Sequence, residues 1–389
     1  MAPRRFIERG ALRWAVAIAL ATGMTGGFRI ASAQAAQGKS LSIGLGVASY
    51  YDDNILQYSS DQLALFQSGT KPERFSIKTS DDVLWRPSIS TYLENRMGDG
   101  RSWALSLKGT GEFHDKNRTA DLHSFSVGWR QDFSLGSGLS LSGYHLPHYY
   151  LRQLFDEDVP SIPGLSRYHR AEFGLTIASI GWRQRVGKKN QTGLSYQYEH
   201  RDYNRDFRER TSNTHQAILD YMRRWPARRG SLGFHGGYRL SDAKGSDGDE
   251  TPGAPPDDPD VSYHGWLAGV DARMDLARRA GWGLASSLGY ELGTREYTSN
   301  AITDKYHFGR NDLSHSVDLT VRWSARLHWA ARGFYRYERY IANLGAAAPA
   351  TTDVGSYSEN QVGLAIDGSA TLWRQRRETE STPEGGESP

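Results

Sequence analysis

Acidic and basic residues recur at short intervals along several segments of the chain. Asp271 precedes Arg273 by two residues, and Glu291 precedes Arg295 by four. In an extended strand both spacings place the two charges on the same face. A strand face that carries both positive and negative charges can form ion pairs with neighbouring strands. If it borders water, it can also create a transverse field that orders water and discriminates between dipolar molecules.

Motifs for catalysis or metal binding are weaker candidates. The twelve histidines form no zinc-binding His-Glu-x-x-His pattern, the sequence has no Gly-x-Ser-x-Gly elbow, and there is no cysteine. These are the usual sequence signs of a metal site or an activated nucleophile. His264 and His315 could each meet a serine or a carboxylate, which leaves a hydrolase as a less favoured alternative. We expect no metal, no cofactor and no enzymatic activity.

The charge balance excludes a further class of partner. The formal net charge is +3, but five arginines and one glutamate fall within residues 1–35. Of the 47 basic and 44 acidic residues, the remainder of the chain therefore keeps 42 and 43. A balanced chain has no overall field that would draw it to nucleic acid, so we expect no nucleic-acid partner.

Residues 1–35 have the layout of a secretory signal peptide. An arginine-rich start is followed by an apolar stretch from Trp14 to Met24 and by small-residue cleavage sites that end at Ala33 or Ala35. The apolar stretch is shorter than the roughly 20 residues of a spanning helix. We therefore expect export rather than a membrane anchor.

From Ser40 onward, apolar residues alternate with small or polar ones, which is the period of a β-strand and not of a helix. The connections between the alternating segments are short and long in turn, as in the short Gly98–Gly100 and the long 52–81. Such regular alternation is not typical of a β-sandwich. The fourteen expected strands are 40–51, 82–96, 102–113, 122–133, 139–153, 168–185, 192–203, 214–225, 231–242, 263–276, 282–297, 312–323, 327–340 and 359–373.

With these features the chain resembles the porin-like transmembrane β-barrels of Gram-negative outer membranes over residues 36–373. The resemblance implies an all-β, antiparallel up-and-down barrel of about 14 strands, with short periplasmic turns and long outer loops. It also implies contact with outer-membrane lipid and lipopolysaccharide. The segment Gly368 to Trp373 resembles the final strand that the outer-membrane insertion machinery recognises, although Trp373 is out of phase with Leu364 and Ile366. Residues 374–389 are predicted to be a disordered periplasmic tail.

Aromatic residues gather at the two ends of the expected strands and predict two interfacial girdles. Eight tryptophans adjoin short turns, namely Trp103, Trp129, Trp182, Trp225, Trp282, Trp323, Trp329 and Trp373. Tyrosines mark the opposite ends, namely Tyr50, Tyr51, Tyr149, Tyr150, Tyr168, Tyr203, Tyr263, Tyr297 and Tyr340.

If the apolar set faces lipid, the alternate set faces the barrel interior, because a lysine or arginine on the lipid face costs about 2–4 kcal/mol at mid-membrane. The expected lumen residues are Lys108, Glu112, Arg130, Glu199, Asp220, Arg239, Asp271, Arg273, Glu291, Arg295, Asp318, Arg322 and Asp367. They form either a passive pore for small polar or amphiphilic solutes or the ion-pair ladder of a closed structural or surface-interaction barrel. The strand count and the small inward residues from Ser42 to Ala48 favour the pore.

One short helix is expected in the first long connection. Ser59 is a plausible N-cap and Gly69 a plausible end, with Leu63 and Phe66 on one face. These apolar side chains either fold into the mouth and narrow it or pack on the loop 156–166, and packing alone is the commoner outcome.

Overall fold

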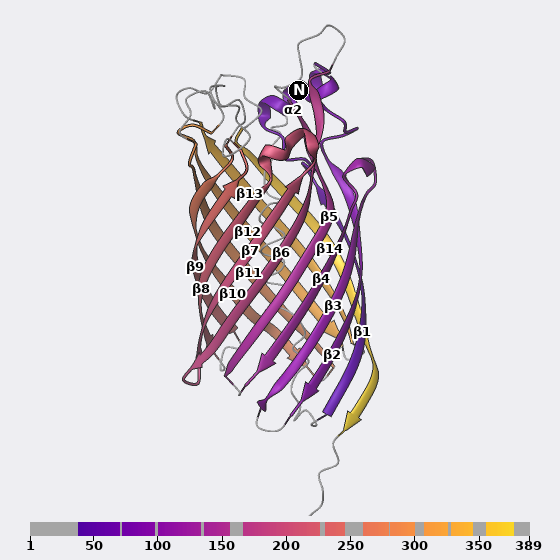
Figure 1. The fold of residues 1–389 in the computed structure, drawn as a ribbon. Helices are drawn as coiled ribbons and strands as arrows, with labels where there is room; N and C mark the ends of the chain where they lie inside the picture. Colours follow the sequence, from indigo (N-terminus) through magenta and orange to yellow (C-terminus); the bar gives the residue numbers. More distant parts are fainter. Residues whose placement is uncertain are drawn as a thin grey trace, which may run out of the picture.

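A computed structural model of the chain describes residues 38–70, 72–97, 100–133, 136–155, 166–225, 230–245, 260–279, 281–299, 307–325, 328–344 and 355–376. The predicted signal peptide lies outside these residues. Fourteen strands form one closed barrel (Figure 1). Each strand pairs antiparallel with its neighbours in sequence, and β1 closes the barrel by pairing with β14.

The predicted strands match the observed ones, and no boundary differs by more than three residues. The strands are β1 (Gly38–Asp52), β2 (Asp82–Arg96), β3 (Ser102–His114), β4 (Leu122–Asp132), β5 (Ser137–Phe155), β6 (Tyr168–Val186), β7 (Asn190–Tyr203), β8 (Ser212–Trp225), β9 (Gly230–Ala243), β10 (Tyr263–Arg279), β11 (Trp282–Tyr297), β12 (Asn311–Ala325), β13 (Trp329–Asn343) and β14 (Tyr357–Arg376). In the described part of the chain the helices are α2 (Ser60–Ser68) and the 3₁₀ helices η1 (Pro72–Arg74), η3 (Arg118–Ala120) and η4 (Arg205–Arg210). None of these helices is long and apolar enough to cross a membrane.

The two ends of the barrel differ. The helices α2, η1, η3 and η4 lie at one end with the described parts of the long connections, whereas β1 begins and β14 ends at the other, among the short turns (Figure 1). Membrane barrels carry long loops on the outside of the cell and short turns in the periplasm. We therefore call these the outer end and the periplasmic end.

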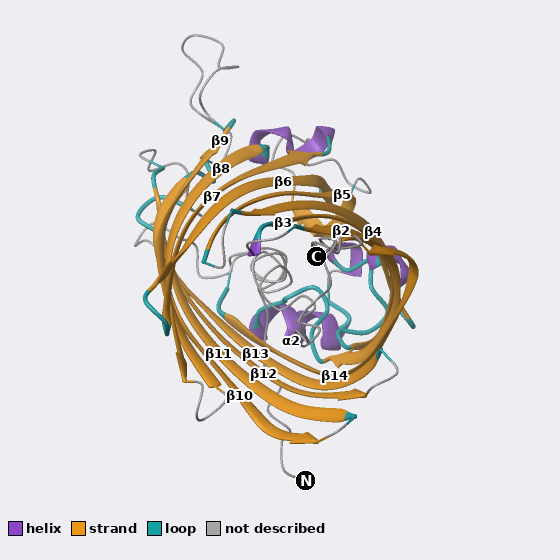
Figure 2. Ribbon diagram, turned by 90° about the horizontal axis from the view of Figure 1, so that it is seen from below, coloured by secondary structure: helices purple, strands orange, loops and turns teal. Residues whose placement is uncertain are grey.

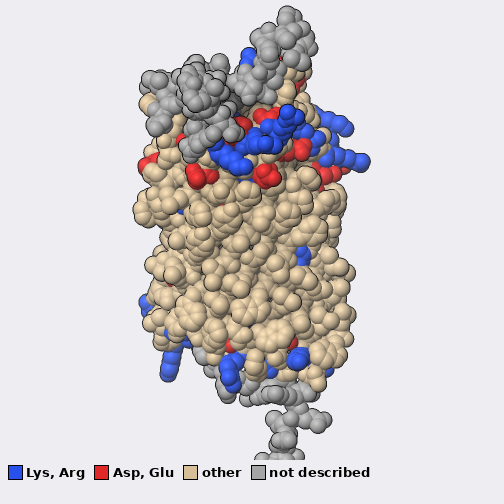
Figure 3. All heavy atoms as spheres, viewed as in Figure 1, with Lys and Arg blue, Asp and Glu red and all other residues tan. Residues whose placement is uncertain are grey.

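The outward face of the barrel is apolar. Large side chains such as Leu219 and Leu364 are 64% and 71% exposed and alternate with inward residues along each strand. Figure 3 shows a wide band that is almost entirely tan, and most of the visible charged groups lie above and below it. Of the tryptophans near short turns, Trp182, Trp323 and Trp329 are among the exposed large apolar residues. The band is the lipid-facing belt of a transmembrane barrel.

The predicted tyrosine girdle is largely wrong. Among the nine tyrosines at the outer strand ends, only Tyr51 is an exposed apolar residue, and Tyr50, Tyr203, Tyr263 and Tyr340 are buried. All four occupy inward positions, and charged side chains lie close to the hydroxyl groups or rings of Tyr50, Tyr263 and Tyr340. A buried tyrosine hydroxyl needs such polar partners, and the lipid side offers few.

The rule that apolar side chains face lipid also fails at one place on the inner wall. In β6, Phe173, Leu175 and Ile177 are 5%, 5% and 2% exposed and belong to a buried cluster with Tyr203 and Phe207. Phe207 lies in η4, which follows β7 at the outer end. The inward apolar residues of β6 are therefore stabilised by packing against neighbouring inward side chains and this connection.

The phase of Trp373 is explained by an irregularity in β14. Opposite β1, Leu41 pairs with Trp373 but the next residue, Ser42, pairs with Thr371. Leu372 is therefore an extra residue in a β-bulge, which shifts the alternation by one position. The bulge returns Trp373 to the outward face, where it is 46% exposed. β14 continues to Arg376, and residues 377–389 lie outside the described part of the chain.

The first outer connection is bound to the barrel closure. Asp52 accepts hydrogen bonds from the backbone N–H of Asn54 at 2.8 Å and from Gln361 at 3.0 Å. Asp53 accepts two from Asn360, through its backbone N–H and its side-chain amide, both at 2.9 Å. Because Asn360 and Gln361 lie on β14, this pair of aspartates joins the start of the connection to the strand that closes the barrel.

A second anchor joins this connection to the next one. Asp82 is fully buried and accepts hydrogen bonds from the backbone N–H groups of Val83 at 2.8 Å, Lys116 at 3.2 Å and Asn117 at 2.9 Å. The Asn117 side chain also donates to Asp82 at 2.9 Å and accepts from the backbone N–H of Lys78 at 2.8 Å. The connections 53–81 and 115–121 are therefore held together by one buried carboxylate.

Replacing this carboxylate should loosen the connection. Asp82→Ala leaves buried N–H donors without an acceptor, at a cost of about 1–3 kcal/mol. We expect tryptic cleavage after Arg74 and Lys78 to become roughly 5–150-fold faster, because cleavage follows the population of the opened loop. Asp81→Ala is the control, since the Asp81 side chain is 37% exposed. Equal cleavage rates of the two variants would show that Asp82 is not an anchor.

Candidate functional site

Helix α2 is formed as predicted from its ends. Ser59 and Gln62 form a reciprocal capping box, and Gly69 ends the helix in a left-handed conformation with φ of 65°. Seen from below, along the barrel axis, α2 lies inside the outline of the strands (Figure 2). The first connection therefore folds over the barrel interior.

The apolar face of α2 packs on the inner wall. Leu63 is 4% exposed and lies in a buried cluster with Tyr50 of β1, Leu84 of β2 and Tyr150 of β5, and Phe66 packs against the same cluster. The described contacts of Leu63 and Phe66 are therefore with the barrel wall, and narrowing of the mouth by these residues stays a prediction. Residues 156–165 of the other proposed partner lie outside the described part of the chain.

The structure places all thirteen predicted lumen residues at inward positions. In each strand they alternate with exposed lipid-facing residues, as Lys108 does with Leu107 and Asp318 with Leu319. They do not form one equivalent set. Glu112, Glu199, Arg239 and Arg295, which lie towards the outer end, are all buried. Of the other nine, four have side-chain exposures of 36% or more, namely Asp271 at 55%, Arg130 at 45%, Asp318 at 41% and Asp367 at 36%, whereas Glu291 is 15% exposed.

A triad of Tyr50, Arg86 and Glu112 occupies the wall of β1 to β3, with Tyr50 and Glu112 buried and the Arg86 side chain 43% exposed. The Arg86 guanidinium donates to the Glu112 carboxylate at 2.7 Å through Nε and to the Tyr50 hydroxyl at 2.7 Å through Nη2. Tyr50 in turn donates to Glu112 at 2.7 Å. Sequence analysis did not single out Arg86, although its lipid-facing neighbour Trp85 places it on the inner face. The triad connects the wall to the cluster that holds α2.

Arginine and tyrosine side chains fill the opposite wall. The Arg295 guanidinium lies 5.0 Å from the centre of the Tyr263 ring and 5.8 Å from that of Tyr340. Arg239 donates through Nε to Gln216 at 2.8 Å. The sequence suggests Glu291 as a neighbour of Arg295 on the same face, but the structure directs the arginine towards the tyrosines instead. The Arg295 guanidinium is therefore surrounded by packed side chains and not by open water.

Histidine, and not arginine, joins the two carboxylates in the middle of the barrel. His235 of β9 lies 3.4 Å from Asp271 through Nδ1 and 3.2 Å from Glu291 through Nε2. Arg336 of β13 approaches Asp318 at 3.7 Å. The sequence predicts that arginines and carboxylates of the same strand face each other. In the structure the charged groups instead contact residues of neighbouring strands. Such contacts depend on how the strands are aligned, which the spacing along one strand does not reveal.

A further polar group lies near the periplasmic end. Asp132 accepts from Arg130 at 2.7 Å and from Ser102 at 2.8 Å, and it also pairs with Arg183. Higher on the wall, Asp367 is 4.0 Å from Arg332. These pairs retain solvent contact and each is worth about 0–1 kcal/mol.

The small inward residues of β1 make room for neighbouring side chains. A Cβ at Gly46 would lie 2.7 Å from the Asp367 carboxylate, and one at Gly44 would lie 2.6 Å from the Ser90 hydroxyl. The expectation that these positions leave free space is wrong, because side chains of β2 and β14 occupy it.

The two histidines considered for hydrolysis face outwards. His315 is hydrogen-bonded to Tyr290 at 2.8 Å, and His264 lies 3.7 Å from Glu296. Both are on the lipid side of their strands, opposite to the polar wall. Among the described residues, no group of three or more histidine and acidic side chains is arranged to hold a metal ion.

The two kinds of environment predict different responses to arginine removal. Arg295→Ala removes a buried cation from between two tyrosine rings and should lower the free energy of unfolding by about 2–4 kcal/mol. Arg273→Ala is the matched control, because this inward arginine is exposed, and it should change stability by less than about 1 kcal/mol. Urea unfolding in lipid vesicles measures both. Equal midpoints for the two variants would contradict a packed outer half.

Comparisons with known proteins give only distant matches. No family model matches the sequence, and no curated protein matches it. Similar solved structures include an anion-selective porin from Comamonas acidovorans, 10% identical with a TM-score of 0.39, covering 86% of this chain and 100% of that one. OprD from Pseudomonas aeruginosa is 13% identical with a TM-score of 0.38, covering 87% and 97%. These values carry no functional inference. The closed antiparallel barrel, its apolar outward belt and its polar inner wall give the chain the fold of a transmembrane β-barrel.

Proposed function

We propose that the barrel is a passive channel for small polar or amphiphilic solutes, with its narrow part in the outer half. The observation that supports this is the exposure of inward charges such as Asp271 and Arg130. An ionised side chain on the inner wall keeps its charge at little cost only where water reaches it. The half of the barrel nearer the periplasm is therefore a hydrated vestibule.

The proposed constriction has three components. Helix α2 covers part of the mouth, the triad around Arg86 supports the wall beneath it, and the arginine and tyrosine group around Arg295 fills the facing wall. The apolar patch of β6 also borders a charged side chain of β7, since the buried Arg201 guanidinium lies 5.8 Å from the centre of the Phe173 ring. A passage that borders both surfaces suits solutes with an apolar and a polar part. The mixed charges of the wall favour neither sign.

A closed structural barrel is the second candidate, and one observation favours it. The outer half is tightly packed, with Glu112 and Arg295 3% and 4% exposed. In such a barrel the same pairs act only as scaffold. The two functions differ in conductance, and helix α2 provides the means to test them.

Loosening α2 should open the proposed channel. The double substitution Leu63→Ala and Phe66→Ala removes the apolar face, and large-to-alanine changes in a packed site cost about 2–5 kcal/mol each. We expect single-channel recordings of the mature protein to show a conductance that rises in this variant. Ala64→Ser, on the exposed face of the same helix, should leave the conductance unchanged.

The same recordings separate the alternatives. A wild-type barrel without conductance at any voltage, together with a silent double variant, would refute the channel and leave the closed structural barrel. A conducting wild type whose conductance does not change in the double variant would retain the channel but remove α2 from its constriction.

A further inference from the structure

Two arginines of the inner wall face each other directly across neighbouring strands. Arg322 of β12 is the register partner of Arg332 of β13, and the apolar neighbours of Arg322, Val321 and Trp323, are exposed on the lipid side. Both guanidiniums therefore belong to the interior face, near the periplasmic turn between the two strands. Like charges directly opposite each other destabilise a sheet, so this pair needs negative charge nearby.

The inner wall supplies only part of that negative charge. Asp367 of β14 lies 4.0 Å from the Arg332 guanidinium, and its charge also acts on Arg322. Within the described residues the Arg322 side chain itself forms no ion pair. One carboxylate therefore serves two guanidiniums. The side chains of Arg332 and Asp367 are 46% and 36% exposed, which leaves them open to the water of the vestibule.

A third cation reaches the same place from the other side of the barrel closure. Lys108 of β3 is exposed, and the charges of Arg332 and Asp367 both act on it. Small residues occupy inward positions between them, namely Ser90 beside Lys108 and Gly44 beside Ser90. The charges of β3, β13 and β14 are therefore close enough to influence one ligand together.

Lys108, Arg322, Arg332 and Asp367 form what we call the basic cluster. Three positive charges and one negative charge give it a net charge of +2. The inner wall as a whole carries both signs, but here its charges do not balance. The excess sits where water can deliver a counter-charge.

Two bordering arginines do not change this balance, because each has a carboxylate of its own. Arg86 is paired with Glu112. Arg273 has Asp271 two residues away on the same face of β10.

We propose that the basic cluster binds a tetrahedral oxyanion with two negative charges, such as the phosphate group of a solute in the vestibule. The two guanidiniums donate to different oxygens of one phosphate, and Lys108 contributes the third positive charge. The bound dianion balances the net charge of +2 and relieves the repulsion between Arg322 and Arg332. This site rests on the proposed channel function, and it names one class among the polar solutes of that channel.

The charge count distinguishes this ligand from a simple carboxylate. A phosphate ester of one alcohol carries a charge of about −1.5 to −2 at pH 7 and three strong acceptor oxygens. A carboxylate has one charge and two oxygens, so it leaves one positive charge of the cluster unmatched. Preference for a dianion over a monoanion is therefore the signature of the site.

Phosphorus NMR of inorganic phosphate tests the site without requiring conductance. With the mature barrel in detergent micelles, at about pH 8 and constant ionic strength, we expect the barrel to broaden the phosphate resonance. Sulfate should displace the phosphate and sharpen the resonance, whereas the same concentration of acetate should not. Arg322→Gln and Arg332→Gln should each weaken phosphate binding about fivefold, the upper end for a solvent-exposed charge pair.

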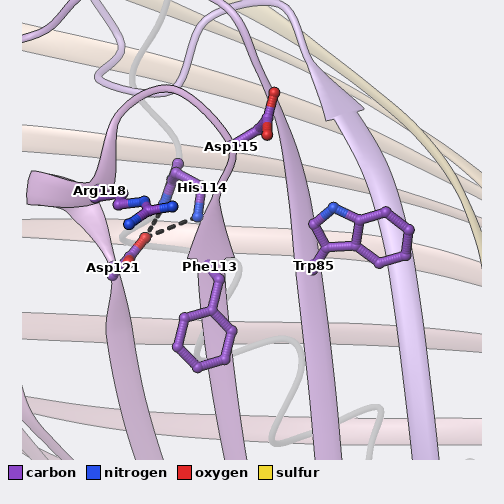
Figure 4. A pocket seen from close by; sticks show the side chains of 6 residues that line it. All are labelled: Trp85, Phe113, His114, Asp115, Arg118 and Asp121. Atoms are coloured by element: carbon purple, nitrogen blue, oxygen red, sulfur yellow. Dashed lines mark hydrogen bonds and ion pairs between the residues drawn. The ribbon is translucent and has the colours of Figure 1, made fainter.

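Two arginines outside the cluster provide matched controls. Arg183→Gln removes an inner-wall arginine of β6 whose side chain is 37% exposed and pairs with Asp132. Arg118→Gln removes an exposed arginine at the outer rim, where it lines a hollow together with Asp115 and Asp121 (Figure 4). Neither control should change the broadening by phosphate.

The outcomes separate this site from the channel, provided that each variant shows the heat-dependent gel shift of a folded barrel. Phosphate binding that the two cluster variants weaken would support the site even if the wild type shows no conductance. A conducting barrel that does not broaden the resonance would overturn the site and leave the channel. Displacement by acetate as readily as by sulfate, or equal loss of binding in the control variants, would also overturn it.

Discussion

A chain in lipid must satisfy its own backbone hydrogen bonds, and the rest of this structure depends on that constraint. Lipid offers no donors or acceptors, so a sheet that crosses it must have no free edge. Here the edge is removed by the pairing of β1 with β14. Closure gives every strand one lipid face and one interior face. Away from the two rims, the ionised side chains of the strands then lie on the interior face, where they can pair or meet water.

The alternation of apolar and polar residues was sufficient to predict the strands and the residues that point inwards, because successive side chains of a strand point to opposite faces of the sheet. It failed where distant segments intervene. The bulge at Leu372 depends on register with β1, and the inward apolar residues of β6 depend on Phe207 of η4. The neighbours of Arg295 likewise lie on β10 and β13. The capping residues predicted α2 because their interactions are local. They could not predict which surface the helix would pack against.

The interior combines two environments that serve different purposes. Towards the outer end, buried pairs and aromatic rings fix the geometry, and the anchors at Asp53 and Asp82 hold the first connection against the wall. Towards the periplasmic end, ion pairs keep contact with water and contribute little to stability. In the proposed channel, a packed constriction above a hydrated vestibule would account for charges of both signs in a barrel whose tightest packing lies near its mouth.

The central claim is that water reaches the middle of the barrel interior, and accessibility of a single thiol tests it most directly. The chain has no cysteine, so Asp271→Cys and Leu288→Cys each carry one thiol, facing inwards and towards lipid, respectively. A charged, membrane-impermeant thiol reagent is applied to the barrel reconstituted in vesicles. The account predicts rapid labelling at position 271 and none at position 288. A thiol at position 271 that reacts no faster than one at position 288 would contradict it.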